Sequence, residues 1–283
     1  MVEANIYVQI TTVFPFHHQV MRHSLLIMLF GMLLLSSCTS RDGDWNVFSI
    51  EEDAGLGARF NEEMEADPVQ YPVLEESRYP ELYKRVRGIV AKILESDELL
   101  HRDDFSWEVR ILHQDTVLNA FCTPGGYIYV YTGLIHYLES EDQLAGVLGH
   151  EIAHADLRHS TEQMTKSYGL QLALRLIFGD DSNVGDIAGS LAGLTFSRGD
   201  ETEADLQSVR YLYDTEYDPR GVARFFEKME QQGESLGPLV FLSTHPNPER
   251  RVEKIMEEWK KLGSKKGKRN VEEYTALRNF LPM

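Results

Sequence analysis

The spacing of apolar residues predicts two helices followed by a short region of strands. Apolar positions recur at helical spacing over residues 51–66 and again over residues 80–94. Between residues 105 and 131 the pattern changes to short runs rich in Val, Ile, Tyr and Phe, which Thr-Pro-Gly-Gly interrupts at residues 123–126. This region predicts a small sheet of about three strands.

The rest of the chain shows helical spacing almost to its end. We expect helices over residues 141–157, 160–178, 184–196, 200–214, 219–232 and 248–261. The pattern contains no internal repeat and gives no sign of a second core. It therefore predicts a predominantly helical α+β fold with one small three-stranded sheet.

Composition and charge exclude two classes of protein. The chain has 283 residues, 42% of them hydrophobic, which is enough to bury a core. Acidic residues outnumber basic ones by 45 to 28, and the resulting charge of −17 opposes binding to nucleic-acid phosphates. The main apolar run, residues 25–35, is shorter than the roughly 20 residues of a membrane-spanning helix. We therefore expect neither a nucleic-acid-binding protein nor a multi-span membrane protein.

The N-terminal segment has the features of a secretory signal. A basic residue precedes the apolar run, and small residues lead from it to Cys38. Leu-Ser-Ser-Cys resembles the bacterial lipobox, in which the cysteine is acylated after cleavage. We expect residues 1–38 to be a leader and Cys38 to become a lipid anchor; an ordinary signal peptide with an unmodified cysteine is the alternative. Residues 1–20 fit a misassigned start or an unstructured extension.

The chain after Cys38 is expected to divide into a tether, a domain and a tail. Residues 39–50 are polar and fit a tether, and residues 51–262 carry the predicted elements of one domain. Thr39 stands where an aspartate would retain a bacterial lipoprotein at the inner membrane, so the resemblance predicts the periplasmic face of the outer membrane. Residues 263–283 are expected to form a basic tail. Its basic residues are either solvated or in contact with anionic lipid headgroups.

The strongest chemical signal is His-Glu-Ile-Ala-His at residues 150–154. On a helix, His150 and His154 lie on one face a turn apart, so both imidazoles can bind one metal ion. Glu151 lies beside them, where its carboxylate can accept a proton from water at the metal. A purely structural zinc site would have no need for Glu151. These residues therefore predict a catalytic zinc.

A third ligand is expected from an acidic segment further along the chain, because a catalytic zinc usually has three protein ligands. In Ser-Arg-Gly-Asp-Glu-Thr-Glu-Ala-Asp, residues 197–205, Glu201 and Asp205 share one face of a predicted helix. We expect Glu201 to bind the metal and Asp205 to orient a ligand histidine. Glu203 points away from this face and should be solvated. His159 is one place off the third histidine of the metzincin pattern and is expected to be structural.

Four motifs in this order resemble peptidase family M48, the HtpX-like gluzincins, over residues 119–251. They are N-A-F-C-T-P-G-G, H-E-I-A-H, S-R-G-D-E-T-E-A-D and S-T-H-P-N-P-E-R-R. The likeness is greatest to the BepA-like and LoiP-like lipoprotein branch, here without tetratricopeptide repeats. It implies a gluzincin metallopeptidase fold with an H-E-x-x-H active-site helix, one zinc ion and hydrolysis of peptide bonds.

The resemblance assigns roles to individual residues. His150, His154 and Glu201 match the family's zinc ligands, Glu151 its general base and Asp205 the acid that orients a ligand. A strand that holds extended substrate by backbone hydrogen bonds is matched by four consecutive residues, Asn119, Ala120, Phe121 and Cys122. Cys122 replaces the alanine more usual at its position.

Further roles concern the segment around Ser-Thr-His-Pro. His245 matches a histidine that can fill the open position of the zinc and hold the enzyme latent. A loop histidine without such a role, or a group that stabilises the oxyanion, are the alternatives. Arg250 and Arg251 follow, and we expect ordinary salt bridges from both.

The resulting hypothesis is a zinc metalloendopeptidase that cleaves unfolded or misassembled cell-envelope proteins, including clients of outer-membrane assembly. The lipid on Cys38 would hold it at the membrane. A non-proteolytic chaperone that uses the same strand is the alternative from another class. The intact ligand and base pattern favours the protease.

Overall fold

The computed structural model describes residues 46–167, 194–232, 240–246 and 250–282. Cys38 and the expected leader lie outside these residues, as do residues 168–193, which include most of the helix expected over 184–196. The helices and strands belong to one compact unit, residues 47–283. Among the described residues, no helix combines the length and apolar character needed to cross a membrane.

In residues 46–107, two helices precede the sheet, within a residue of the expected bounds: α2 (Ile50–Ala66) and α3 (Pro80–Leu94). α2 starts at a capping box, in which Ser49 accepts a hydrogen bond from the Glu52 backbone and the Glu52 carboxylate accepts one from Ser49 N. α3 starts with Pro80, whose lack of an N–H costs nothing at the first position of a helix. Local sequence therefore fixes where both helices begin.

Three strands form a mixed sheet in the order β1-β3-β2, which confirms the predicted small sheet. β1 (Glu108–Leu112) pairs in parallel with β3 (Tyr127–Tyr131), and β2 (Ala120–Cys122) pairs antiparallel with β3. A short 3-10 turn, Pro124–Gly126, joins β2 to β3, and its two glycines have φ of 76° and 85°. Glycine adopts such values without steric cost. Because β3 lies between β1 and β2, β2 forms one edge of the sheet.

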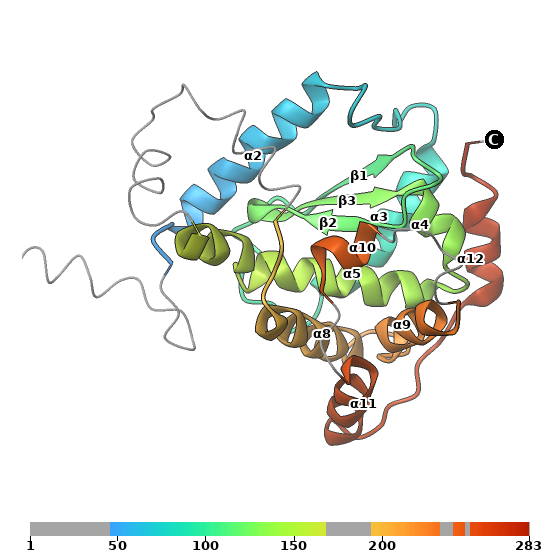
Figure 1. Ribbon diagram of the computed structural model, residues 1–283. Helices are drawn as coiled ribbons and strands as arrows, with labels where there is room; N and C mark the ends of the chain where they lie inside the picture. Colours follow the sequence, from blue (N-terminus) through green and yellow to red (C-terminus); the bar gives the residue numbers. More distant parts are fainter. Residues whose placement is uncertain (1–45, 168–193, 233–239, 247–249, 283) are drawn as a thin grey trace, which may run out of the picture. The chain divides into compact units, whose positions relative to one another are not determined.

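The two faces of the sheet pack against different helices. Tyr127 and Tyr129 of β3 pack with Phe60 and Met64 of α2. The alternate residues Ile128 and Val130 enter the main core, as the two-residue period of a strand requires. Figure 1 shows α2 on one side of the sheet and α5 (Glu141–Asp156) on the other.

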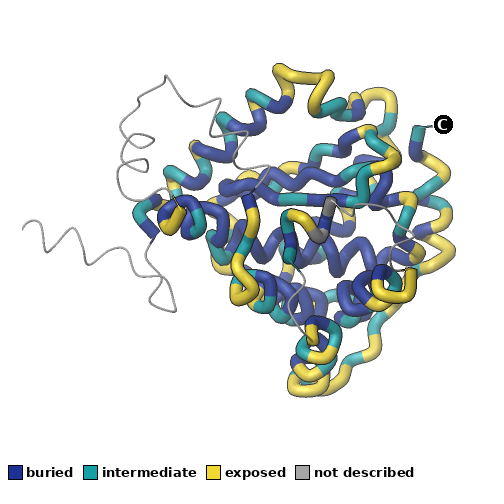
Figure 2. Tube along the Cα trace, viewed as in Figure 1, coloured by how far each residue is buried: buried dark blue, intermediate teal, exposed yellow. Residues whose placement is uncertain are grey.

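Eight helical segments follow the sheet in the described part of the chain. They are α4 (Thr132–Tyr137), α5 (Glu141–Asp156), a helical segment at residues 159–167, α8 (Arg198–Tyr213), α9 (Gly221–Gln232), α10 (Val240–Thr244), α11 (Arg251–Lys261) and α12 (Val271–Arg278). Every residue of α5 is buried, and Figure 2 shows this helix dark blue throughout. Gly146 admits the backbone of α9, since a Cβ there would lie 2.2 Å from Val222 N. These helices confirm a predominantly helical α+β fold.

Two segments differ from the element expected there, and the short helices α4 and α10 form where no helix is expected. Residues 194–197 are not helical, so the helix expected over residues 184–196 does not extend to its predicted end. The chain after residue 262, expected as a basic tail, includes α12, whose Tyr274 and Leu277 are fully buried in the main core. The Tyr274 hydroxyl also donates to Ile135 O at 2.8 Å. These apolar contacts fix the segment despite the basic residues before it.

Candidate metal centre and active site

Helix α5 carries His150, Glu151 and His154 in the interior of the protein. Both histidines are 0% exposed and Glu151 is 1% exposed. The two Nε2 atoms of the histidines lie 3.1 Å apart, because one helical turn separates the side chains. Gly149 lets α8 approach here, since a Cβ would lie 2.8 Å from Ser208 Oγ. The imidazoles converge as their spacing predicts.

Helix α8 supplies Glu201. A capping box of Ser197 and Asp200 starts the helix and places Glu201 in its first turn. Glu201 is fully buried; its Oε1 lies 3.5 Å from His154 Nε2 and its Oε2 lies 3.6 Å from His150 Nε2. The three residues expected to bind the metal are therefore brought together.

His245, directly after α10, completes a group of four. Its Nδ1 lies 2.9 Å from Glu201 Oε1 and 3.3 Å from His150 Nε2. The Phe241 ring stacks on the imidazole with centroids 4.5 Å apart, which fixes its orientation. One ligand atom from each of His150, His154, Glu201 and His245 lies within 4.8 Å of all the others. We call these four residues the ligand group. Among the described residues, the ligand group is the candidate metal site.

The donor set fits zinc. Three imidazoles and one carboxylate are ligands that zinc accepts in tetrahedral sites. Burial lowers the pKa of His154 well below its usual value, so the imidazole stays neutral as metal binding requires. Burial alone would raise the pKa of Glu201, but hydrogen bonds with His154 and His245 hold it well below its usual value. The carboxylate is therefore ionised and ready to bind a cation.

Asp205 and Arg251 contact two of the candidate ligands, His150 and Glu201. Asp205 Oδ1 lies 3.0 Å from His150 Nδ1, the nitrogen on the far side of the ring from Glu201. Arg251 on α11 donates to both carboxylates, to Asp205 at 2.5 and 2.8 Å and to Glu201 at 3.0 Å. Arg251 is 2% exposed, and its guanidinium lies over the Phe226 ring. These contacts orient His150 and Glu201 toward a common point.

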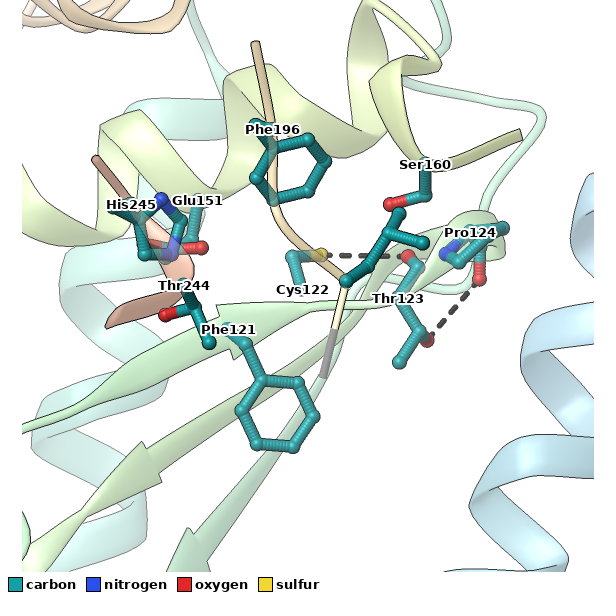
Figure 3. A pocket seen from close by; sticks show the side chains of 10 residues that line it. Phe121, Cys122, Thr123, Pro124, Glu151, Ser160, Phe196, Thr244 and His245 are labelled. Carbon is teal, nitrogen blue, oxygen red and sulfur yellow. Dashed lines mark hydrogen bonds and ion pairs between the residues drawn. The ribbon is translucent and has the colours of Figure 1, made fainter. Parts of the chain in front are cut away.

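Glu151 lies at the boundary between the ligand group and a pocket. Its Oε1 is buried, accepts no hydrogen bond from any described residue and lies 3.6 Å from His245 Nε2. Burial raises the pKa of Glu151, and the neighbouring His245 and His150 partly offset the increase. Figure 3 shows the residues that line the pocket, which are Phe121, Cys122, Thr123, Pro124, Glu151, Ser160, Leu194, Phe196, Thr244 and His245. A carboxylate with a free acceptor atom faces this pocket.

The strand predicted to hold substrate borders the same pocket. Ala120, Phe121 and Cys122 form β2, and Asn119 just before it accepts a hydrogen bond from Tyr131 N at 3.1 Å. Cys122 is buried, and burial raises the pKa of its thiol well above its usual value, so the side chain behaves as a small buried hydrophobe. β2 pairs on one side with β3, and its other side is the edge of the sheet.

A sequence model described as peptidase family M48 matches residues 80–259. The chain belongs to peptidase family M48. Mitochondrial metalloendopeptidase OMA1 of Arabidopsis thaliana is 38% identical over 155 residues, 53% of this chain and 31% of that protein. Its namesake in Schizosaccharomyces pombe is 34% identical over 161 residues, 55% and 47% of the two chains. The beta-barrel assembly-enhancing protease of Escherichia coli K12 is 31% identical over 150 residues, which are 48% of this chain and 31% of that protein.

Membership of the M48 family confirms the predicted metallopeptidase class and its zinc cofactor. This M48 peptidase spans about a third to a half of the length of the curated relatives it matches. The roles of individual residues, including the substrate strand and Cys38, stay predictions.

For Arg251 of this M48 peptidase, the sequence predicts only an ordinary salt bridge. The structure places its guanidinium against Glu201 of the candidate metal site and against Asp205, which contacts His150. Arg250, its neighbour, instead pairs with Glu253 at the surface, as expected. The adjacent arginines look alike in sequence, and only the packing of α11 on α8 separates their roles. A signal was present in the run of apolar residues Val252, Ile255, Met256 and Trp259, which fixes the buried face of α11.

Proposed function

We propose that this M48 peptidase cleaves peptide bonds in unfolded or misassembled cell-envelope proteins, with His150, His154 and Glu201 as zinc ligands. The observation that carries the proposal is the buried Glu151 carboxylate, with a free acceptor atom, between the ligand group and the pocket. Zinc bound at this group would polarise the scissile carbonyl and make the attacking water more acidic. Such a carboxylate favours hydrolysis over the chaperone alternative.

The chain's own residues perform the other tasks. Glu151 accepts a proton from the attacking water and delivers it to the leaving amine, since its raised pKa suits both transfers. Asp205 and Arg251 keep His150 and Glu201 oriented throughout. β2 holds an extended substrate segment by adding it to the sheet edge, a mode that reads backbone more than side chains. The substrate must therefore be unfolded, or offer an extended loop.

The substrate class and location rest on two further observations. One set of relatives bears the name beta-barrel assembly-enhancing protease, and the leader ends in a lipobox-like sequence at Cys38. We propose that the enzyme acts at the periplasmic face of the outer membrane. An outer-membrane β-barrel protein offered unfolded should be cleaved, and the same protein folded in detergent micelles should not. Cleavage of casein without cleavage of the unfolded β-barrel would contradict the substrate class.

Replacing His245 with Ala should increase hydrolysis of an unfolded substrate. The imidazole lies within the ligand group, and its removal opens the fourth position while three ligands and Glu151 remain. Zinc affinity should fall only modestly. kcat and zinc stoichiometry measured on His245→Ala, with the exposed His113→Ala as control, separate the possible roles. A lower kcat at full zinc content would instead identify an oxyanion-stabilising group, and unchanged values a loop histidine without such a role.

Replacing Cys38 with Ala should abolish membrane attachment and leave unprocessed precursor or soluble protein. Cys38 lies outside the described residues, so this prediction rests on the lipobox-like sequence. The acyl chains of a mature bacterial lipoprotein together give stable anchoring. Membrane fractionation with a high-salt wash measures the difference. A Cys38→Ala protein that stays bound after the wash would point to residues 25–35 as an uncleaved anchor.

A further inference from the structure

His159 lies against His154 on the side away from the ligand group. The two Nδ1 atoms are 2.9 Å apart, and the rings meet edge to face with centroids 5.0 Å apart. His159 is 3% exposed, and its other nitrogen, Nε2, lies 3.5 Å from Glu203 Oε2. A line of contacts therefore runs from His154 through His159 to the Glu203 carboxylate.

The position of the proton on each imidazole ring determines which nitrogen donates and which accepts along these contacts. His154 Nε2 faces the ligand group, so Nδ1 of the same ring must carry the proton when Nε2 binds a metal. That N–H needs an acceptor, and His159 Nδ1 is in place to accept it. His159 then carries its proton on Nε2, the atom that faces Glu203. We propose that His159, backed by Glu203, is the positioning residue that fixes the tautomer and orientation of His154 for zinc.

The two ligand histidines are thus held in different ways. His150 Nδ1 meets the carboxylate of Asp205 directly, and Arg251 holds that carboxylate. On its Nδ1 side, His154 reaches a described carboxylate through the ring of His159, and the Glu203 side chain at the end of these contacts is 47% exposed. The support for His154 therefore ends near solvent, whereas the support for His150 is buried.

A break in the helix brings His159 to this position. On an uninterrupted helix a residue five places after His154 would point about 140° away from it around the axis. α5 ends at Asp156, and Arg158 has φ of 64°, in the left-handed region that non-glycine residues rarely adopt. Its guanidinium is held by the buried Asp53 at 2.7 and 3.1 Å. The turn returns the chain so that the His159 ring faces His154.

Zinc affinity tests this role without reference to hydrolysis. The full chain is titrated with zinc in competition with a chelator of known affinity, as wild type, His159→Leu and His159→Asn. Leu and Asn are similar in size, but only the Asn amide oxygen can accept a hydrogen bond at the Nδ1 position. His159→Leu should weaken zinc binding by about 10- to 100-fold, and His159→Asn should restore most of it. The absorption spectrum of the cobalt-substituted protein should change with Leu and return with Asn.

Three outcomes would overturn the inference. Wild-type zinc affinity in His159→Leu would do so, and so would an equal loss in Leu and Asn, which would indicate packing alone. The metal-free variants are compared by thermal unfolding, and if His159→Leu does not fold, Glu203→Gln decides. Because the Glu203 side chain is half exposed, Glu203→Gln should weaken zinc binding by about 2- to 10-fold, and unchanged affinity would contradict the role of His159 and Glu203.

The inference rests on the proposed role of His154 as a ligand. His154→Ala, measured in the same titration, distinguishes a wrong ligand assignment for His154 from a wrong positioning role for His159. If His154→Ala binds zinc as wild type does, the ligand assignment is wrong. If His154→Ala loses zinc while His159→Leu does not, only the positioning role fails.

Discussion

Replacing Glu151 with Gln should abolish hydrolysis while the fold and zinc content stay as in the wild type. The amide cannot accept the proton of the attacking water, and the residues of the ligand group are unchanged. A general base contributes typically 10²- to 10⁴-fold, so the rate should fall by about that factor. The measurement combines cleavage of an unfolded casein-type substrate with zinc analysis of the purified protein.

The exposed Glu62→Gln on α2 is the matched control, since it makes the same change far from the pocket. It should leave the rate unchanged. Full activity in Glu151→Gln would show that another group accepts the proton. Absence of hydrolysis from the wild type under all conditions would favour the chaperone alternative, in which client proteins are held at β2 and no fragments form.

Replacing Glu201 with Ala should cause a larger loss of zinc affinity than replacing any residue that only supports a ligand. The change removes a charged ligand and leaves Arg251 with one carboxylate partner fewer in a buried site. The effect should exceed the roughly 100-fold upper range for residues that only support a ligand. Competition titration gives the affinity, and circular dichroism of the metal-free protein shows whether the fold survives.

Glu203→Ala is the control on the same helix. Its side chain is half exposed and faces His159 rather than the ligand group, so its effect should be much smaller. Equal losses in the two variants would mean that the ligand has been assigned to the wrong face of α8.

The central part of the site follows from local sequence. His150, Glu151 and His154 lie on one helix, and Glu201 and Asp205 on another, so helical geometry alone fixes which side chains share a face. The bounds of α3 agree with its apolar spacing residue for residue. Each of these features depends on residues within a few positions of one another.

Other features depend on packing between distant segments. Arg251 reaches Asp205 only because α11 packs on α8, and the apolar face of α11 indicates that Arg251 is buried but not which side chains it contacts. The position of His159 depends on a left-handed turn at Arg158, which the distant Asp53 holds. The segment after residue 262 has the composition of a basic tail, but Tyr274 and Leu277 anchor α12 in the main core. Such contacts cannot be derived from the sequence around each residue.

Diffraction at the zinc absorption edge tests the central claim most directly. We expect one anomalous peak per chain in a crystal of the purified enzyme, about 2.0–2.2 Å from His150 Nε2, His154 Nε2 and a Glu201 oxygen. In the latent enzyme the His245 ring should occupy the fourth position. A peak that lacks any one of His150, His154 and Glu201, or zinc bound elsewhere on the chain, would contradict it.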